Sequence, residues 1–116
     1  PFSIRAKVAT DSTNIRFYYA DRTFLVFNWE MNTSELRFND PATGRKNGFP
    51  GVGEVEVGVF HDIEIDILDR KIEVKVNGET RAELSGDYED LSGRVGIGPA
   101  AASTVTVKEM TLVELD

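Results

Sequence analysis

The sequence predicts an all-β protein that folds as a two-sheet antiparallel β-sandwich of about ten strands. Apolar and polar residues alternate with a period of two along most of the chain, as expected for strands with one buried face. Turn-forming segments separate these strands at intervals of about 8 to 12 residues, a spacing typical of sandwiches and barrels. No segment longer than a turn holds the 3.6-residue apolar period of a helix.

The bulk composition bounds the size of the protein and its classes of partner. A length of 116 residues with 41% hydrophobic residues predicts one domain spanning residues 1–116. The 20 acidic and 13 basic residues give a net charge of −7, so we expect neither nucleic acid nor an anionic membrane as a partner. The chain has no cysteine, which excludes disulfides and thiolate sites. It begins with Pro1 and not with methionine, and we therefore expect either a processed chain or a module of a longer protein with neighbouring domains.

The N-terminal half begins with a strand over residues 2–8, in which apolar residues occupy every second position. Residues 15–19 and 23–30 form a predicted hairpin, and residues 36–38 form a short strand before a turn that contains Pro41 and Gly44. Three glycines and one proline in residues 47–53 predict a loop.

The C-terminal half contains the clearest alternation of the chain. Ile63, Ile65 and Ile67 alternate with acidic residues, so one face of this strand is apolar and the other acidic. Asn77-Gly78 predicts a type I′ hairpin turn because both residues tolerate positive φ. The apolar phase shifts within the closing strand, which predicts a β-bulge near residues 108–109. The strands predicted in this half cover residues 55–57, 62–67, 72–76, 79–84, 94–98 and 104–115.

The second half of the chain resembles the concanavalin A-like lectin and glucanase superfamily, including its laminin-G-like jelly-roll domains. The resemblance rests on an aromatic residue before a strand, an Asn-Gly hairpin, a Gly-x-Val-Gly-Ile strand and an alternating closing strand. These features lie in residues 60–65, 72–79, 93–98 and 105–112. The resemblance implies a jelly-roll sandwich whose concave sheet often binds carbohydrate.

The predicted hairpin over residues 15–30 holds most of the aromatic residues. Apolar residues occupy both odd and even positions in residues 24–29, so both faces of this strand are apolar. The strand is therefore either covered on both faces or carries aromatic side chains into a groove. Trp29 is accordingly either a core residue or a platform for a ligand. Sugars need both an aromatic surface for their C–H faces and polar groups for their hydroxyls. Residues that offer such contacts here are Arg16, Tyr18, Asn28, Trp29, Glu30 and Arg37.

Two carboxylates on the strand over residues 62–67 raise the alternative of catalysis. Glu64 and Asp66 share one face of the strand, and the segment is similar to the Glu-x-Asp-x-x-Glu signature of laminarinase-type glycoside hydrolases. Asp69 stands where that signature has its final glutamate. A solvated polar face above an isoleucine core explains the same pattern, and we therefore predict that the protein is not an enzyme.

Acidic residues also occur in predicted loops, where they could help bind a structural calcium ion. They are Asp40, Asp87, Glu89 and Asp90. No EF-hand spacing is present, and His61 is the single histidine, which argues against a zinc site or a serine triad. We therefore predict no cofactor and no metal-binding residues, with a structural calcium as the alternative.

Together these features predict a non-catalytic carbohydrate-binding module that presents a polar and aromatic sheet face, as part of a larger extracellular or cell-surface protein. One alternative is a structural or protein-interaction accessory domain with an exposed apolar patch that includes Phe24, Val26 or Phe49. A second alternative is a minimal glycoside hydrolase that uses Glu64 and Asp66. The predicted binding face comprises Arg16, Tyr18, Asn28, Trp29, Glu30, Arg37, Glu64 and Asp66.

Overall fold

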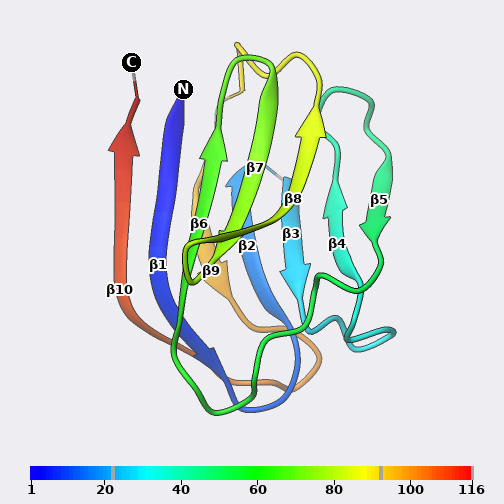
Figure 1. Cartoon of the computed structure of the whole chain (residues 1–116), viewed down its shortest axis with the longest axis vertical. Helices are drawn as coiled ribbons and strands as arrows, with labels where there is room; N and C mark the ends of the chain where they lie inside the picture. Colours follow the sequence, from blue (N-terminus) through cyan, green and yellow to red (C-terminus); the bar gives the residue numbers. More distant parts are fainter. Residues whose placement is uncertain (22, 92, 116) are drawn as a thin grey trace.

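A computed structural model describes residues 1–21, 23–91 and 93–115. In it the chain forms an antiparallel β-sandwich (Figure 1). Sheet A has the strand order β10-β1-β6-β7-β8, and sheet B has the order β5-β4-β3-β2-β9. Within the described ranges, no helix has the length and apolar character needed to cross a membrane. The strands are β1 (Phe2–Thr10), β2 (Ile15–Ala20), β3 (Thr23–Phe27), β4 (Leu36–Asn39), β5 (Lys46–Phe49), β6 (His61–Ile67), β7 (Lys71–Val76), β8 (Glu79–Ser85), β9 (Gly96–Gly98) and β10 (Val105–Glu114). The all-β, ten-strand prediction is confirmed.

The core lies between the two sheets and is built from the predicted alternation. Ile63, Ile65 and Ile67 of β6 are buried, and they belong to the same hydrophobic cluster as the aromatic residues of sheet B. Phe17 and Phe27 meet edge to face there, with ring centroids 6.2 Å apart. Burial of each such side chain stabilises the fold by about 1.5 to 3 kcal/mol.

Two local predictions in sheet A are confirmed. Asn77 and Gly78 connect β7 to β8 with φ values of 51° and 83°, as a type I′ turn requires. In β10, Glu109 lies opposite Lys7 and Val107 lies opposite Val8, so Lys108 is the extra residue of a β-bulge.

Sheet B departs from the prediction at β5, which lies partly within the expected loop. The ring of Phe49 stacks on that of Phe38, with centroids 5.0 Å apart. This packing favours a strand that pairs with β4 over a loop. A Cβ atom at Gly48 would lie 2.5 Å from the Glu35 carboxyl group, so the glycine leaves room for this side chain over β5. Glycine therefore marks a close approach between β5 and the chain before β4.

Strand β3 ends three residues earlier than predicted, at Phe27. Asn28 has φ of 52° and is 2% exposed, and its amide oxygen and nitrogen bond to the backbone nitrogen and oxygen of Val55 at 2.8 and 2.9 Å. Val55 is thus a buried loop residue and the predicted strand over residues 55–57 is absent. Trp29 and Glu30 consequently lie outside the strand.

Strand β10 is an edge strand with uncovered apolar side chains. Figure 1 shows it at one side of the molecule, with no strand of sheet B behind it. Val107, Met110 and Leu112 lie opposite core-facing residues of β1, yet they are 41%, 42% and 57% exposed. Sheet A therefore extends beyond the part of the sandwich that sheet B covers.

Candidate ligand-binding face

The outer face of sheet B carries a row of five residues that lie opposite one another on neighbouring strands. In order across the sheet they are Gly98, Arg16, Val26, Arg37 and Gly48. Val26 is only 1% exposed although it points away from the core. The row therefore has one arginine on each side of the buried Val26 and a glycine, which has no side chain, at each end.

A second row, Gly96-Tyr18-Phe24, lies beside the first. The Tyr18 and Phe24 rings are 5.1 Å apart, and the Arg16 guanidinium lies 4.8 Å from the Phe24 ring centroid, within the range of a cation–π contact. A Cβ atom at Gly96 or Gly98 would have no heavy atom within 4 Å. The glycines of β9 thus leave open space beside Tyr18 and Arg16.

A hollow of about 300 Å³ opens next to Tyr18 and is lined by Asp21, Arg94 and Gly96 among others. Its rim is held by Asp21, whose Oδ1 accepts a 2.9 Å hydrogen bond from the Arg94 backbone nitrogen. Gly93 permits this approach because it has φ of 130°, and a Cβ atom there would lie 2.5 Å from the Asp21 backbone nitrogen. The segment before β9 is therefore fixed against the β2 end of the sheet.

Trp29 is neither fully buried nor an open platform. Its indole ring is half-buried, and the Arg37 guanidinium lies 4.7 Å from the ring centroid. Arg37 Nη1 also lies 3.4 Å from Glu35 Oε2. The charge of Arg37 thus has both an aromatic and a carboxylate partner.

Four of the predicted site residues lie together on this face, namely Arg16, Tyr18, Trp29 and Arg37. Asn28 does not, because it is buried and both ends of its amide bind Val55. Glu30 is exposed in the turn that follows Asn28. Sequence reasoning missed Phe24 and the open glycines of β9. The Gly-x-Gly spacing of β9 was the available signal, since it places two glycines on one face of a strand.

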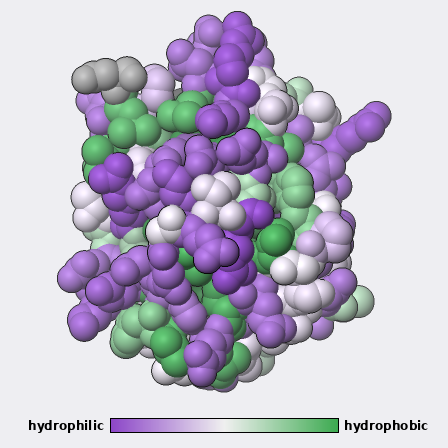
Figure 2. Space-filling model, viewed as in Figure 1, coloured by the Kyte–Doolittle hydropathy of each residue, from purple (hydrophilic) through white to green (hydrophobic). Residues whose placement is uncertain are grey.

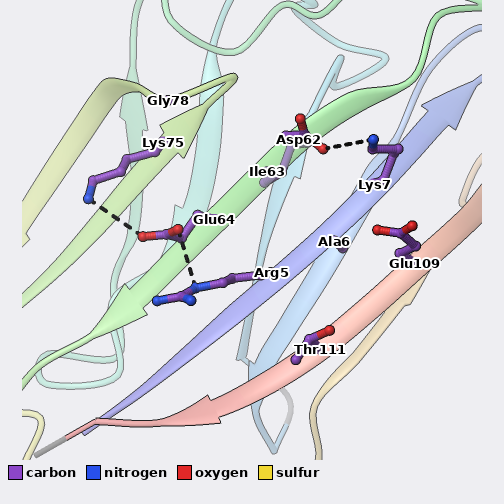
Figure 3. Close-up of a pocket in the computed structure, with 10 residues that line it drawn as sticks. All are labelled: Arg5, Ala6, Lys7, Asp62, Ile63, Glu64, Lys75, Gly78, Glu109 and Thr111. Atoms are coloured by element: carbon purple, nitrogen blue, oxygen red, sulfur yellow. Dashed lines mark ion pairs between the residues drawn. The ribbon is translucent and has the colours of Figure 1, made fainter.

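Glu64 and Asp66 lie on the outer face of sheet A, so the prediction that they share one face with Tyr18 and Arg37 is wrong. Lys75 Nζ is 3.5 Å from a carboxylate oxygen of each. Arg5 lies 3.3 Å from Glu64 (Figure 3), and Ser3 donates a 2.6 Å hydrogen bond to Asp66. Burial of the isoleucines on the opposite side of β6 forces both carboxylates outward, onto the sheet that does not carry the aromatic hairpin.

The outer face of sheet A is a network of ion pairs. Asp66, followed by Glu73 and Glu64, raises the pKa of Lys75 above its usual value by Coulombic attraction. A hollow of about 270 Å³ on this face is lined by Arg5, Lys7 and other charged residues (Figure 3). Figure 2 shows that hydrophilic residues dominate the same face. Glu64 and Asp66 are thus paired with cations of the protein on this face.

Three of the four loop carboxylates considered for calcium are also engaged with protein groups. Arg70 pairs with Asp87 at 3.9 Å and with Glu89 at 3.3 Å. Asp40 is buried and accepts hydrogen bonds from the Tyr88 hydroxyl and the Ala42 backbone nitrogen. Among the residues that the structure describes, no group of three or more histidine, cysteine, aspartate or glutamate residues could hold a metal ion.

Comparisons with known proteins find similarity in structure only. No protein-family model matches the chain, and no curated protein matches its sequence. A carbohydrate-binding module, CBM66 from Bacillus subtilis, superposes with a TM-score of 0.70 at 8% identity, over 97% of this chain and 74% of that one. The Caenorhabditis elegans galectin LEC-6 gives a TM-score of 0.67 at 11% identity, over 97% of this chain and 82% of the galectin.

A Bacillus licheniformis β-glucanase gives a lower TM-score of 0.53 at 12% identity. The match covers 96% of this chain but 52% of the glucanase. These structures share two packed antiparallel sheets in the same arrangement, which agrees with the resemblance stated from the sequence. The chain has the concanavalin A-like jelly-roll fold.

Proposed function

We propose that this protein is a non-catalytic carbohydrate-binding module and that it binds a saccharide on the outer face of sheet B. The observation that carries the proposal is the position of Tyr18. Its ring lies between Phe24 on one neighbouring strand and side-chain-free Gly96 on the other, beside the 300 Å³ hollow. A sugar ring that enters over Gly96 would place its C–H face against an aromatic ring whose position is set by Phe24.

The polar groups of the face complement this aromatic surface. Arg16 and Arg37 each stack on an aromatic ring, at 4.8 and 4.7 Å from the ring centroids. Guanidinium groups held in this way lose little conformational entropy when they donate hydrogen bonds to hydroxyl oxygens. The carbohydrate-binding module and the galectin that share the fold support a sugar as the class of ligand.

Calorimetric titration with a panel of neutral and acidic oligosaccharides tests the proposal. We expect binding that a Tyr18→Ala substitution reduces at least about tenfold, since loss of stacking on one ring removes about 1 to 3 kcal/mol in comparable aromatic platforms. A Val113→Ala variant, on the outer face of sheet A, should bind as the parent does. Absence of binding to every saccharide, or equal loss in both variants, would contradict the proposal.

The proposal extends to the setting of the protein. We place the module outside the cell or at the cell surface, attached to a larger protein whose other domains it brings to a glycan. Detection of the parent protein on intact cells by surface labelling tests the location.

Protein interaction is a second candidate function, and the edge strand β10 favours it. Phe24 and Phe49 are half-buried and Val26 is buried, whereas Val107, Met110 and Leu112 are among the exposed large apolar residues and lie on one strand. An exposed edge strand offers unpaired backbone groups as well as apolar side chains. Sedimentation velocity of the parent and a Leu112→Lys variant tests this candidate, which requires an association that the variant weakens.

A further inference from the structure

The outer face of sheet B is basic although the protein as a whole is acidic. Strands β2 to β5 and β9 contain no aspartate or glutamate, and their outward positions carry Arg16, Arg37 and Lys46. The carboxylates next to these strands in sequence are Asp21 after β2, Glu35 before β4 and Asp40 after β4. The outward positions of these strands thus carry three cations and no carboxylate, although the chain as a whole has a net charge of −7.

Arg16 differs from the other described strand arginines because its guanidinium contacts an aromatic ring but forms neither an ion pair nor a hydrogen bond with any described residue. Arg5 pairs with Glu64 at 3.3 Å and Arg37 pairs with Glu35 at 3.4 Å, whereas Arg16 forms no ion pair with any described residue. Its Nε is buried and has no hydrogen-bond partner among the described atoms. A buried donor without an acceptor is rare in folded proteins, and here it means that no carboxylate of the described protein lies against Arg16 to neutralise its charge.

The surroundings of Arg16 hold this cation in place beside open space. The contact with Phe24 positions the guanidinium, and Gly98 lies directly opposite Arg16 on β9 with no atom within 4 Å of where its Cβ would be. A group of the ligand can therefore approach next to Arg16 without displacing a side chain. The guanidinium fork matches a carboxylate in geometry as well as in charge.

We infer that the saccharide bound by this face is acidic and places a carboxylate over Gly98, beside Arg16. This inference rests on the proposed function and names the chemical class of its ligand. Arg37, already neutralised by Glu35, would contact hydroxyl groups, while Arg16 contacts the acid. The net charge of −7 repels a long polyanion, so the preferred ligand carries an isolated acidic unit on an otherwise neutral chain.

The test compares each acidic oligosaccharide with its own methyl ester, which keeps the shape and removes the charge. The probes are xylotriose substituted with one glucuronic acid, and sialyllactose, each with its ester and its unsubstituted neutral parent. We expect at least one acid to bind about ten- to a hundredfold more tightly than its ester, the range expected for a charge-assisted hydrogen-bonded pair. Which acid is preferred distinguishes a uronic acid from a sialic acid.

Two variants should each remove the preference for the acid over its methyl ester, by different means. Arg16→Gln deletes the cation, and Gly98→Glu supplies a carboxylate from the protein itself, so both should bring the acid and its ester to equal affinity. Arg5→Gln, which removes an ion-paired arginine from the opposite face, should keep the preference. If Arg16→Gln does not fold, as thermal unfolding would show, Gly98→Glu alone decides the question.

The possible results distinguish an acidic ligand from carbohydrate binding in general. Equal affinity of acid and ester in the parent protein overturns the inference, while the proposed carbohydrate binding stands. A preference for acids that persists in both variants also overturns it, as does tighter binding of a heparin hexasaccharide that is independent of Arg16. Failure of every saccharide to bind contradicts the proposed function itself.

Discussion

Arg37 covers one face of Trp29, with the guanidinium carbon 4.7 Å from the centroid of the indole ring. The tryptophan follows Asn28, where the chain leaves β3, and the arginine lies on β4, so the contact joins two segments that the sequence alone does not align. It leaves Trp29 half-buried. The ring is thus a support for Arg37 as much as a surface for a ligand.

This contact predicts a change in the fluorescence of Trp29, the single tryptophan of the chain. An Arg37→Ala substitution uncovers the ring, so its emission maximum should move to longer wavelength. The cost in stability should be about 0.5 to 1 kcal/mol, as for other exposed cation–π pairs. Lys46→Ala, at another cation of the same face, is the control. An unchanged emission maximum in Arg37→Ala would show that the contact is absent in solution.

Filling the space above β9 should block the ligand without harming the fold. Gly96 does not have positive φ, and its Cβ would meet no atom within 4 Å, so Gly96→Val should unfold at nearly the same temperature as the parent. Oligosaccharide affinity should fall at least about tenfold, because the added side chain occupies the space next to Tyr18. The matched control is Thr111→Val in the hollow on sheet A. If Gly96→Val retains full affinity, the ligand does not enter over β9.

Asn28 should be important for stability and not for binding contacts. Asn28→Ala removes two buried hydrogen bonds to Val55 and places alanine at φ of 52°. We expect a loss of about 2 to 4 kcal/mol in the free energy of unfolding, measured by urea denaturation. Asn28→Gly tolerates the backbone conformation and should lose about 1 kcal/mol less. Asn32→Ala, at an exposed position, should change stability little, and equal effects of all three variants would contradict this role.

Glu64 should act in an ion-pair network and not in catalysis. Glu64→Gln leaves Lys75 with Asp66 and Glu73 as partners, so the free energy of unfolding should change by about 1 kcal/mol or less. Saccharide affinity should be the same as in the parent. Hydrolysis of a glucan by the parent that disappears in Glu64→Gln would establish the enzymatic alternative instead.

Alkaline pH should destabilise the fold through two tyrosines. Burial, together with the negative charge of Asp40, raises the pKa of Tyr88 to about 12 and raises that of Tyr19 as well. A raised pKa means that the folded state favours the neutral phenol. Its contribution is therefore complete below the unfolded-state pKa of about 10 and is lost as the pH rises through the folded value.

Denaturation of the parent and a Tyr88→Phe variant between pH 8 and pH 12 measures this effect. The variant cannot ionise at residue 88, so its stability should fall less steeply above about pH 10. Tyr18→Phe, at a tyrosine on the sheet surface, controls for a general effect of losing a hydroxyl. Identical pH profiles for the parent and Tyr88→Phe would contradict the coupling between Tyr88 and Asp40.

Local rules determined most of the fold from the sequence. The alternation at Ile63, Ile65 and Ile67 is sufficient to set which face of β6 is buried, because side chains on a strand alternate with a period of two. Asn77-Gly78 similarly determines a hairpin, since positive φ at both residues is the requirement of its turn. The position of β5 could not be predicted in this way, because stacking of Phe49 on Phe38 outweighs the turn propensity of Gly48 and of Pro50, which follows the strand.

The candidate site was only partly accessible from the sequence. Arg16 and Tyr18 share a face because they are two residues apart on one strand, and that relation is local. Which strands join into the same sheet is set by long-range packing, so tertiary structure alone placed Arg37 beside Trp29 and put Glu64 and Asp66 on the opposite side of the sandwich. The sequence by itself determined which residues point out of each strand. Only the pairing of strands decided which of those residues can touch one ligand, because strand register and order depend on how the whole core packs.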